Sequence, residues 1–185
     1  MTSEWDKMVG GQRYDASDPQ LVRARERARA LSFRFNHAPP EHDEVRRQAI
    51  AALLGGLGQR VRVEPPFHCD YGVNIHLGDD VYVNMNCVML DCALVRIGDR
   101  VLVGSGVQLV TAAHPVDFAE RKIGLEFAMP ITIGDDVWIG AGAIICPGVT
   151  IGARSVIGAG SVVVREVAPD VVAAGNPCRV LRRLT

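Results

Sequence analysis

Hydrophobic side chains recur every six residues along the chain from Leu77 to Val163. The first residue of each hexad is aliphatic: Leu77, Val83, Met89, Ile97, Val103, Leu109, Ile133, Ile139, Ile145, Ile151, Ile157 and Val163. The fifth residue is small or β-branched: Val81, Cys87, Ala93, Val101, Val107, Ala113, Val137, Ala143, Val149, Ser155, Ser161 and Val167. A strict period of six fits neither a helix nor an alternating strand, and hexapeptide repeats are typical of a parallel β-helix. We therefore expect each hexad to form one strand and one corner, with three hexads in a triangular coil.

The second residue of the hexads shows a longer register, which predicts four coils. In groups of three it is glycine, glycine and an apolar residue, except that Asn84 replaces the first group's second glycine. Asparagine tolerates a left-handed backbone almost as well as glycine, so Asn84 is either a corner residue or a functional one. Extra residues at 95–96 and 115–132 are predicted to leave the prism at one corner, which in solenoids is commonly the binding edge.

The segments outside the repeats have other patterns. Residues 1–58 are predicted to be a helical segment, with one helix from Pro19 to about Phe35, capped by Asp18, and a second from Glu41 to Leu54. These helices should pack on the prism or on a neighbouring subunit. Residues 59–76 are predicted to be an irregular starting coil that covers the open end, 77–168 the β-helix, and 169–185 a short basic tail.

Composition indicates one soluble domain. The chain has 185 residues, with 20 Lys and Arg against 21 Asp and Glu, so no general affinity for nucleic acid or anionic membranes is implied. No apolar run approaches the ~20 residues of a membrane span, and the N-terminus lacks a signal-peptide core, which predicts a cytoplasmic protein. The five cysteines lack the paired spacing of zinc or redox sites, and Cys87 is expected in the core.

His114 is the first candidate for chemistry, because it ends a hexad immediately before the long insertion. Imidazole suits general-base work near neutral pH, although a corner histidine can also bond only to local backbone. Asp70, Asp91 and Glu126 are acidic residues near the same edge, and each could equally be a turn or surface group. Since the predicted regular prism contains no second histidine, a three-histidine zinc site is not expected.

Several motifs together resemble the maltose and galactoside O-acetyltransferases of the hexapeptide-repeat acyltransferase superfamily. They are NIHLGDDVYVNMNCVMLD, TAAHPVD, PITIGDDVWIGAGAIICPGVTIGARSVIGAGSVV and VVAAGNPCRVLR, preceded by the helical YDASDPQLVRARERARALSFRFN. The resemblance implies a mainly β fold, a left-handed parallel β-helix, which is an exception to the right-handed crossover rule. It also implies a homotrimer that binds acetyl-CoA in the groove between neighbouring prisms.

The resemblance also implies roles for single residues. His114 matches the catalytic base, and Asn84 matches an acceptor-site residue near the reacting centre. Acceptor contacts are expected from Asp15, Arg25, Asp70, Asn84 and the retained Asp91. Glu126 is a further candidate for the acceptor site from its place in the inserted loop, where an acid can also orient or charge-stabilise His114. Asp70 replaces a serine of the galactoside enzymes, and Cys92 stands where they have an aspartate, so these two departures concern the identity of the sugar.

The cofactor positions follow in the same way. Trp138, Ala141 and Ala159 align with the wall that the pantetheine arm follows, and Val164, Arg165, Arg179 and Arg182 align with positions near the adenosine and its phosphates. A basic tail suits a phosphate-bearing ligand on its residues alone. We expect direct acetyl transfer from acetyl-CoA to a sugar hydroxyl, without a metal. Two alternatives stay open: another acceptor, such as serine, a lipo-oligosaccharide or an antibiotic, and a non-catalytic trimeric scaffold.

Overall fold

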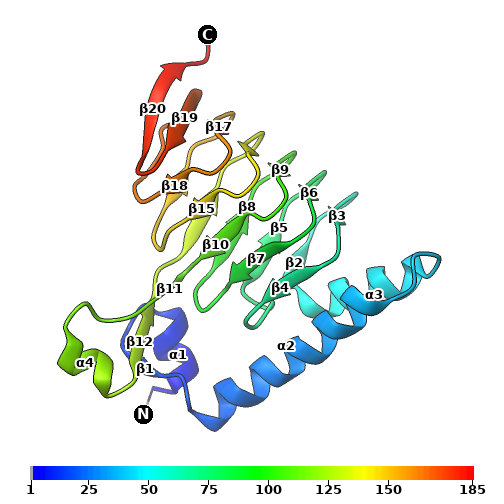
Figure 1. Cartoon of the computed structure of the whole chain (residues 1–185). Helices are drawn as coiled ribbons and strands as arrows, with labels where there is room; N and C mark the ends of the chain where they lie inside the picture. The colour runs from blue at the N-terminus through cyan, green and yellow to red at the C-terminus, as the bar shows by residue number, and fades with distance from the viewer. Residues whose placement is uncertain (1) are drawn as a thin grey trace.

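A triangular β-helix forms the body of the protein, with helices at its N-terminal end and a hairpin at its C-terminal end (Figure 1). This computed structural model describes residues 2–185. Consecutive strands turn from one face of the triangle to the next, and each strand pairs in parallel with the strand one coil away. The predicted mainly β fold, a left-handed parallel β-helix, is confirmed.

Three stacked sheets make the three faces. The first contains β2 (Gly56–Leu57), β5 (Ile75–Leu77), β8 (Val95–Ile97), β13 (Ile131–Ile133) and β16 (Thr150–Ile151). The second contains β3 (Arg62–Val63), β6 (Tyr82–Val83), β9 (Leu102–Val103), β14 (Trp138–Ile139), β17 (Val156–Ile157), β19 (Val171–Gly175) and β20 (Cys178–Arg183). The third contains β4 (Phe67–Cys69), β7 (Cys87–Leu90), β10 (Gln108–Val110), β15 (Ile144–Ile145) and β18 (Val162–Val163).

The hexad pattern becomes a set of columns inside the prism. Leu77 pairs with Ile97 in the next coil, and Ile97 pairs with Ile133 in the one after it. Every first-position residue from Leu77 to Val163 is buried. The fifth positions close the corners and are buried as well, except for Ala113, which is half-buried, and Cys87 lies in the core as predicted. Burial of stacked aliphatic side chains on all three faces of the prism therefore holds the coils together.

The prediction of an irregular starting coil is wrong in two respects. Strands β2, β3 and β4 pair in register with the next coil, so that Leu57, Val63 and Cys69 stand beneath Leu77, Val83 and Met89. The repeat thus begins one coil earlier than its aliphatic pattern suggests. The end of the stack is covered by helices instead, because α2 (Pro19–His37) and α3 (Asp43–Leu53) bury Ala28, Phe35, Ala49, Ile50 and Leu53 in the same core.

The helical segment otherwise follows the sequence. Asp18 caps α2 by accepting a hydrogen bond from the backbone N–H of Gln20, with Pro19 in the first turn, as predicted. A short helix not predicted from the sequence, α1 (Glu4–Val9), precedes α2 and begins with a reciprocal Ser3–Asp6 capping box. Helix α1 and β1 (Tyr14–Asp15) lie beside the inserted loop rather than under the prism (Figure 1).

The two predicted insertions differ from each other. Residues 95–96 do not leave the prism, because they begin β8, and Val95 is buried between Ile75 and Ile131 of adjacent coils. Residues 131–132 likewise belong to β13. The chain leaves the prism between β10 and β13. This excursion contains β11 (Ala112–Ala113), α4 (Phe118–Lys122) and β12 (Leu125–Ala128). Strand β12 pairs antiparallel with both β11 and β1.

The left-handed explanation for Asn84 is also wrong. The left-handed backbone lies two residues later, at Asn86, whose φ is 62°. Glycine at the second hexad position instead allows close approach between coils, because a Cβ on Gly104 would lie 2.6 Å from the backbone nitrogen of Ala141. Asn84 is therefore not at a corner that requires positive φ.

The basic tail is an ordered hairpin. β19 continues the second sheet, and β20 folds back antiparallel on it, so that Ala174 pairs with Arg179 and Val172 with Arg182. This hairpin extends the second sheet beyond β17 at the C-terminal end of the prism (Figure 1).

Candidate active site

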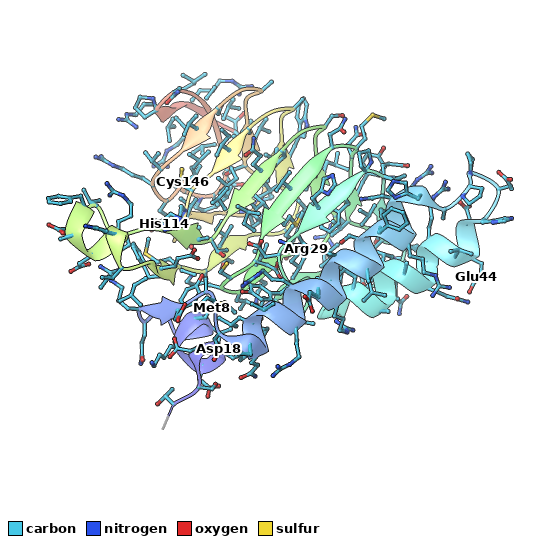
Figure 2. The ribbon with its side chains drawn as sticks, turned by 60° about the horizontal axis from the view of Figure 1, so that its bottom comes forward. Met8, Asp18, Arg29, Glu44, His114 and Cys146 are labelled. Carbon is cyan, nitrogen blue, oxygen red and sulfur yellow. The ribbon has the colours of Figure 1, made fainter. Side chains whose placement is uncertain are left out.

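One corner of the prism, between the third and the first sheet, holds His114. Thr111 fixes the chain on its way to that residue: its hydroxyl donates to the carbonyl of Leu90 at 2.6 Å and accepts from the N–H of Ala93 at 3.0 Å. β11 follows, and His114 then stands at the lip of the α4 loop with an exposed side chain (Figure 2). A buried hydroxyl thus anchors the backbone directly beside an accessible imidazole.

The N-terminal segment holds the α4 loop. Tyr14 is buried and donates its hydroxyl to Glu126 Oε2 at 2.8 Å, and burial raises the pKa of the tyrosine. Arg13 forms an ion pair with Glu120 at 3.0 Å and lies 4.5 Å above the ring of Phe127. The loop is therefore tied on two sides by residues that are far away in the sequence.

The strand register relates Glu126 to His114. In the antiparallel β11–β12 pair, Ala112 stands opposite Ala128 and Ala113 opposite Phe127. One further step along this register brings His114 opposite Glu126. Opposite residues of an antiparallel pair project from the same face. The β11–β12 pairing ends at Ala113, so the relation of His114 to Glu126 extends the register and is not a paired contact.

A polar cluster of Arg25, Asp70, Tyr71 and Cys92 lies at the same corner, one and two coils below. The Cys92 thiol donates to Asp70 Oδ2 at 3.5 Å, and Arg25 donates to the Tyr71 hydroxyl at 2.7 Å and to the carbonyl of Ala16 at 2.7 Å. Burial raises the pKa of Asp70, while the Cys92 hydrogen bond and the Arg25 charge act in the opposite direction. The corner therefore combines a half-buried carboxylate with a positioned cation.

Asp91 has a different environment from the other predicted acceptor contacts. It is fully buried, and its carboxylate accepts hydrogen bonds from the backbone N–H groups of Asp70, Tyr71 and Asn74 at 3.1, 2.8 and 3.2 Å. Burial raises its pKa to about 6, and the backbone donors partly offset that effect. This geometry favours a role in holding the loop of residues 70–74 over direct contact with an acceptor.

Asp15 lies at the rim of the cluster. It is exposed, and its carboxylate accepts hydrogen bonds from the N–H and hydroxyl of Ser17 at 2.8 and 2.7 Å. Asp15 also pairs with Leu125 across β1 and β12. It is thus brought to the inserted loop, one residue along from the Tyr14–Glu126 contact.

Asn84 and three cofactor candidates are on another corner, between the second and third sheets. Ala141 and Ala159 stack there in successive coils, with the N–H of Gly160 donating to the carbonyl of Ala141 at 2.9 Å. Trp138 projects outward from β14 just before this corner and is 54% exposed. Within one chain, these residues are not brought to His114.

The remaining cofactor candidates lie near the C-terminal hairpin. Arg165 and Arg179 line one hollow of about 150 Å³ between the last corner and β20, together with Glu166 and Val180. Val164 is exposed at the end of β18. Arg182 is exposed on β20 but does not line that hollow. Two of the three predicted phosphate-binding arginines therefore converge.

Comparison with known proteins decides the family. Residues 7–58 match the maltose acetyltransferase hexapeptide capping motif, and residues 130–165 match the bacterial transferase hexapeptide, six repeats. The galactoside O-acetyltransferase of Escherichia coli is 46% identical over 164 residues, covering 89% of this chain and 81% of that relative. The chain belongs to the maltose and galactoside group of hexapeptide-repeat acetyltransferases.

Solved structures of the group superimpose on nearly the whole chain. A maltose O-acetyltransferase from Clostridium difficile aligns with a TM-score of 0.97 and 43% identity, covering 99% of this chain and 98% of the other. A hexapeptide-repeat acetyltransferase from Vibrio cholerae, complexed with acetyl-CoA, aligns with a TM-score of 0.92 and 43% identity, covering 99% of both chains. The predicted enzyme class, an acetyl-CoA-dependent acyltransferase, is confirmed.

Two further observations concern metal-binding groups and helix character in residues 2–185. They contain no group of three His, Cys, Asp or Glu side chains arranged to hold a metal ion. None of their helices has the length and apolar character needed to cross a membrane. A cytoplasmic location stays a prediction.

Tyr14, Tyr71 and Thr111 were not predicted from the sequence. All three are buried polar residues whose hydroxyl groups hold the corner by hydrogen bonds. Thr111 is a polar residue that follows the apolar Leu109 and Val110 shortly before the predicted insertion at 115–132, which is only a weak sequence signal of a functional position. Tyr14 has no local signal, since its partner is 112 residues away.

Proposed function

We propose that this acetyltransferase transfers the acetyl group of acetyl-CoA to a hydroxyl of a sugar, with His114 as general base. The observation that carries the proposal is the exposed imidazole of His114 at the corner that also holds Arg25 and Asp70. A cation and a carboxylate beside a base can orient a polyhydroxyl acceptor by several hydrogen bonds. The names of the maltose and galactoside relatives support a sugar acceptor.

The proposed reaction is a direct transfer. His114 removes the proton from the acceptor hydroxyl as that oxygen bonds to the thioester carbonyl carbon. The carbon–sulfur bond then breaks, and the thiolate of coenzyme A leaves and takes up the proton from His114. An acetyl-cysteine intermediate is disfavoured, because burial raises the pKa of the nearby Cys92 thiol and keeps it protonated.

Glu126 is proposed to orient His114. The strand register supports this role, because it brings the two residues opposite each other, and Tyr14 holds the carboxylate at 2.8 Å. A carboxylate in this place favours the imidazolium that forms when His114 takes the proton. Glu126 is also a proposed acceptor contact, together with Asp15.

The complete site is proposed to form between subunits of a homotrimer. Asn84, Trp138, Ala141 and Ala159 lie on one corner, and His114 lies on another, so the two groups can meet only if the corner of one prism faces the other corner of its neighbour. A cyclic arrangement of three prisms repeats that contact in a closed ring. Asn84 of one subunit would then hydrogen-bond near the reacting centre of the next.

Acetyl-CoA suits the residues proposed to bind it. Ala141 and Ala159 lack bulky side chains, which allows the pantetheine arm to lie against the corner, and the exposed Trp138 offers an apolar face beside it. At the hairpin, Arg165 and Arg179 share one hollow where phosphates could be bound, with Val164 nearby and Arg182 further along β20.

A panel of acceptors tests the proposal. Purified protein is incubated with acetyl-CoA and, in turn, sugars, amino acids, oligosaccharides and aminoglycosides, and release of the free thiol is followed. We expect release above the hydrolysis background with at least one sugar, and acetyl ester formation detected by mass spectrometry. Transfer only to serine or to an antibiotic, or to no acceptor at all, would contradict it.

A further inference from the structure

A second hollow adjoins the proposed acceptor site and has no part in the mechanism above. It encloses about 210 Å³ between α2 and β4. Its lining includes Arg29, Ser32, Phe33, His37, His68 and Cys69. Figure 2 shows Arg29 on α2 and His114 beside the α4 loop.

The most unusual feature of this hollow is an exposed aromatic platform. Phe33 is 64% exposed although it lies on a helix that buries its opposite face in the core. The His37 ring stacks on it, with centroids 4.0 Å apart and planes inclined by 22°, and His37 Nδ1 lies 2.9 Å from the Phe33 carbonyl oxygen. Because Phe33 lines the hollow and stays exposed beside the stacked His37 ring, it offers an apolar surface to a ligand.

Polar groups around the platform are available to a ligand. Within residues 2–185, the side chains of Arg29 and His68 form no hydrogen bond or ion pair, and both line the hollow. A sugar ring has apolar C–H faces and hydroxyl groups at its edge. An aromatic plane with free donors at its border matches both properties.

The hollow lies next to the polar cluster of Arg25, Asp70, Tyr71 and Cys92 along two elements, α2 and β4. Cys69 immediately precedes Asp70, and Arg29 lies one helical turn from Arg25. Phe33 follows at a further turn, about 12 Å along the helix axis from Arg25. Two linked sugar rings can span that distance.

We propose that the preferred acceptor is a disaccharide or a longer sugar, with a second ring that stacks on Phe33 and hydrogen-bonds to Arg29 and His68. The inference rests on the proposed function, since the first ring carries the reacting hydroxyl beside Asp70 and His114. Phe33 is therefore a residue that determines acceptor length and does not take part in the chemistry.

Paired acceptors test this inference. Values of kcat/KM are measured at saturating acetyl-CoA for maltose against glucose and for lactose against galactose, with wild type, Phe33→Ala, Phe33→Tyr and Arg34→Ala. Arg34 is an exposed residue of the same helix that does not line the hollow. We expect wild type to favour the disaccharide in at least one pair by about fivefold. Phe33→Ala should remove that preference without changing the monosaccharide value, and the other two variants should keep it.

The outcomes separate the two proposals. Equal use of both members of each pair by wild type, or an equal loss on both members in Phe33→Ala, overturns the second-ring site and leaves sugar acetylation standing. Transfer to no sugar overturns both. Sedimentation of Phe33→Ala provides a structural check, because dissociation of the oligomer would assign this surface to a subunit contact and overturn the inference.

Discussion

The thiol of Cys92 donates a hydrogen bond to the carboxylate of Asp70 at 3.5 Å. The resemblance to the galactoside enzymes implies a serine at the position of Asp70 and an aspartate at the position of Cys92. We propose that the two differences compensate each other, because the contact allows one carboxylate to be supplied to this corner from either residue.

Exchanging the two residues should show this compensation. Cys92→Asp alone places two carboxylates in contact, which repel each other, so we expect a lower melting temperature and at least a tenfold lower kcat/KM for the acceptor. The double variant Asp70→Ser/Cys92→Asp should recover most of both losses. Kinetics with saturating acetyl-CoA and thermal melts measure the effect, and a double variant that is worse than Cys92→Asp would rule out compensation.

Asp91 should lower the free energy of unfolding as pH rises, which is the opposite of the usual effect of a carboxylate. Burial raises its pKa to about 6, whereas an unfolded aspartate titrates near 4. Between these values the folded protein binds the proton more tightly, so the contribution of this group to the free energy of unfolding falls as pH rises. Relative to Asp91→Asn, wild type should lose about 2 kcal/mol between pH 4 and pH 7. Urea unfolding at four pH values measures the difference, and a difference that is constant with pH would contradict the prediction.

Arg179 should affect the coenzyme and not the chemistry. Because it shares a hollow with Arg165, Arg179→Ala should raise the apparent KM for acetyl-CoA by about tenfold while kcat stays near the wild-type value. Arg183→Ala is the matched control, an exposed arginine of the same strand outside the hollow. Saturation curves in both variants measure this, and equal effects would indicate a general charge effect instead of a phosphate site.

Because adjacent coils approach closely at Gly104, substituting Gly104 should lower the free energy of unfolding more than substituting Gly106. Gly104→Ala would bring a Cβ to 2.6 Å from the Ala141 nitrogen and 2.9 Å from the Ile139 carbonyl oxygen, so we expect about 2 kcal/mol of destabilisation or more. Gly106→Asn faces open space at a φ of +69°, which asparagine tolerates, and should cost less than about 1 kcal/mol. Comparison of the two unfolding free energies tests the explanation, and the reverse order would refute it.

Much of the fold could be predicted because each hexad carries its own signal. Leu77, Ile97 and Ile133 are aliphatic for the same reason, and no tertiary information is needed to align them. A starting coil is predicted from the sequence, but its regular register is not, because Cys69 takes the aliphatic position that stands beneath Met89. The helices were predicted, but the surface they cover depends on which coil is terminal.

The site was harder to predict. His114 is found from its place before the insertion, but the Tyr14–Glu126 contact joins residues 112 positions apart, and no local pattern encodes it. Asn84 stands out because it interrupts the glycine pattern of the second hexad position, and its backbone is not left-handed. Its proposed role depends on an assembly of several chains, which a single sequence does not specify.

The most direct test of the central claim is the turnover of His114→Ala with acetyl-CoA and the best sugar acceptor, together with its affinity for coenzyme A by titration calorimetry. Loss of a general base should lower kcat by at least ~10²-fold, and coenzyme affinity should stay within about twofold of wild type, because the side chain is exposed and holds no structural contact in residues 2–185. Turnover close to that of wild type, with the coenzyme bound normally, would contradict the assignment of His114 as the base.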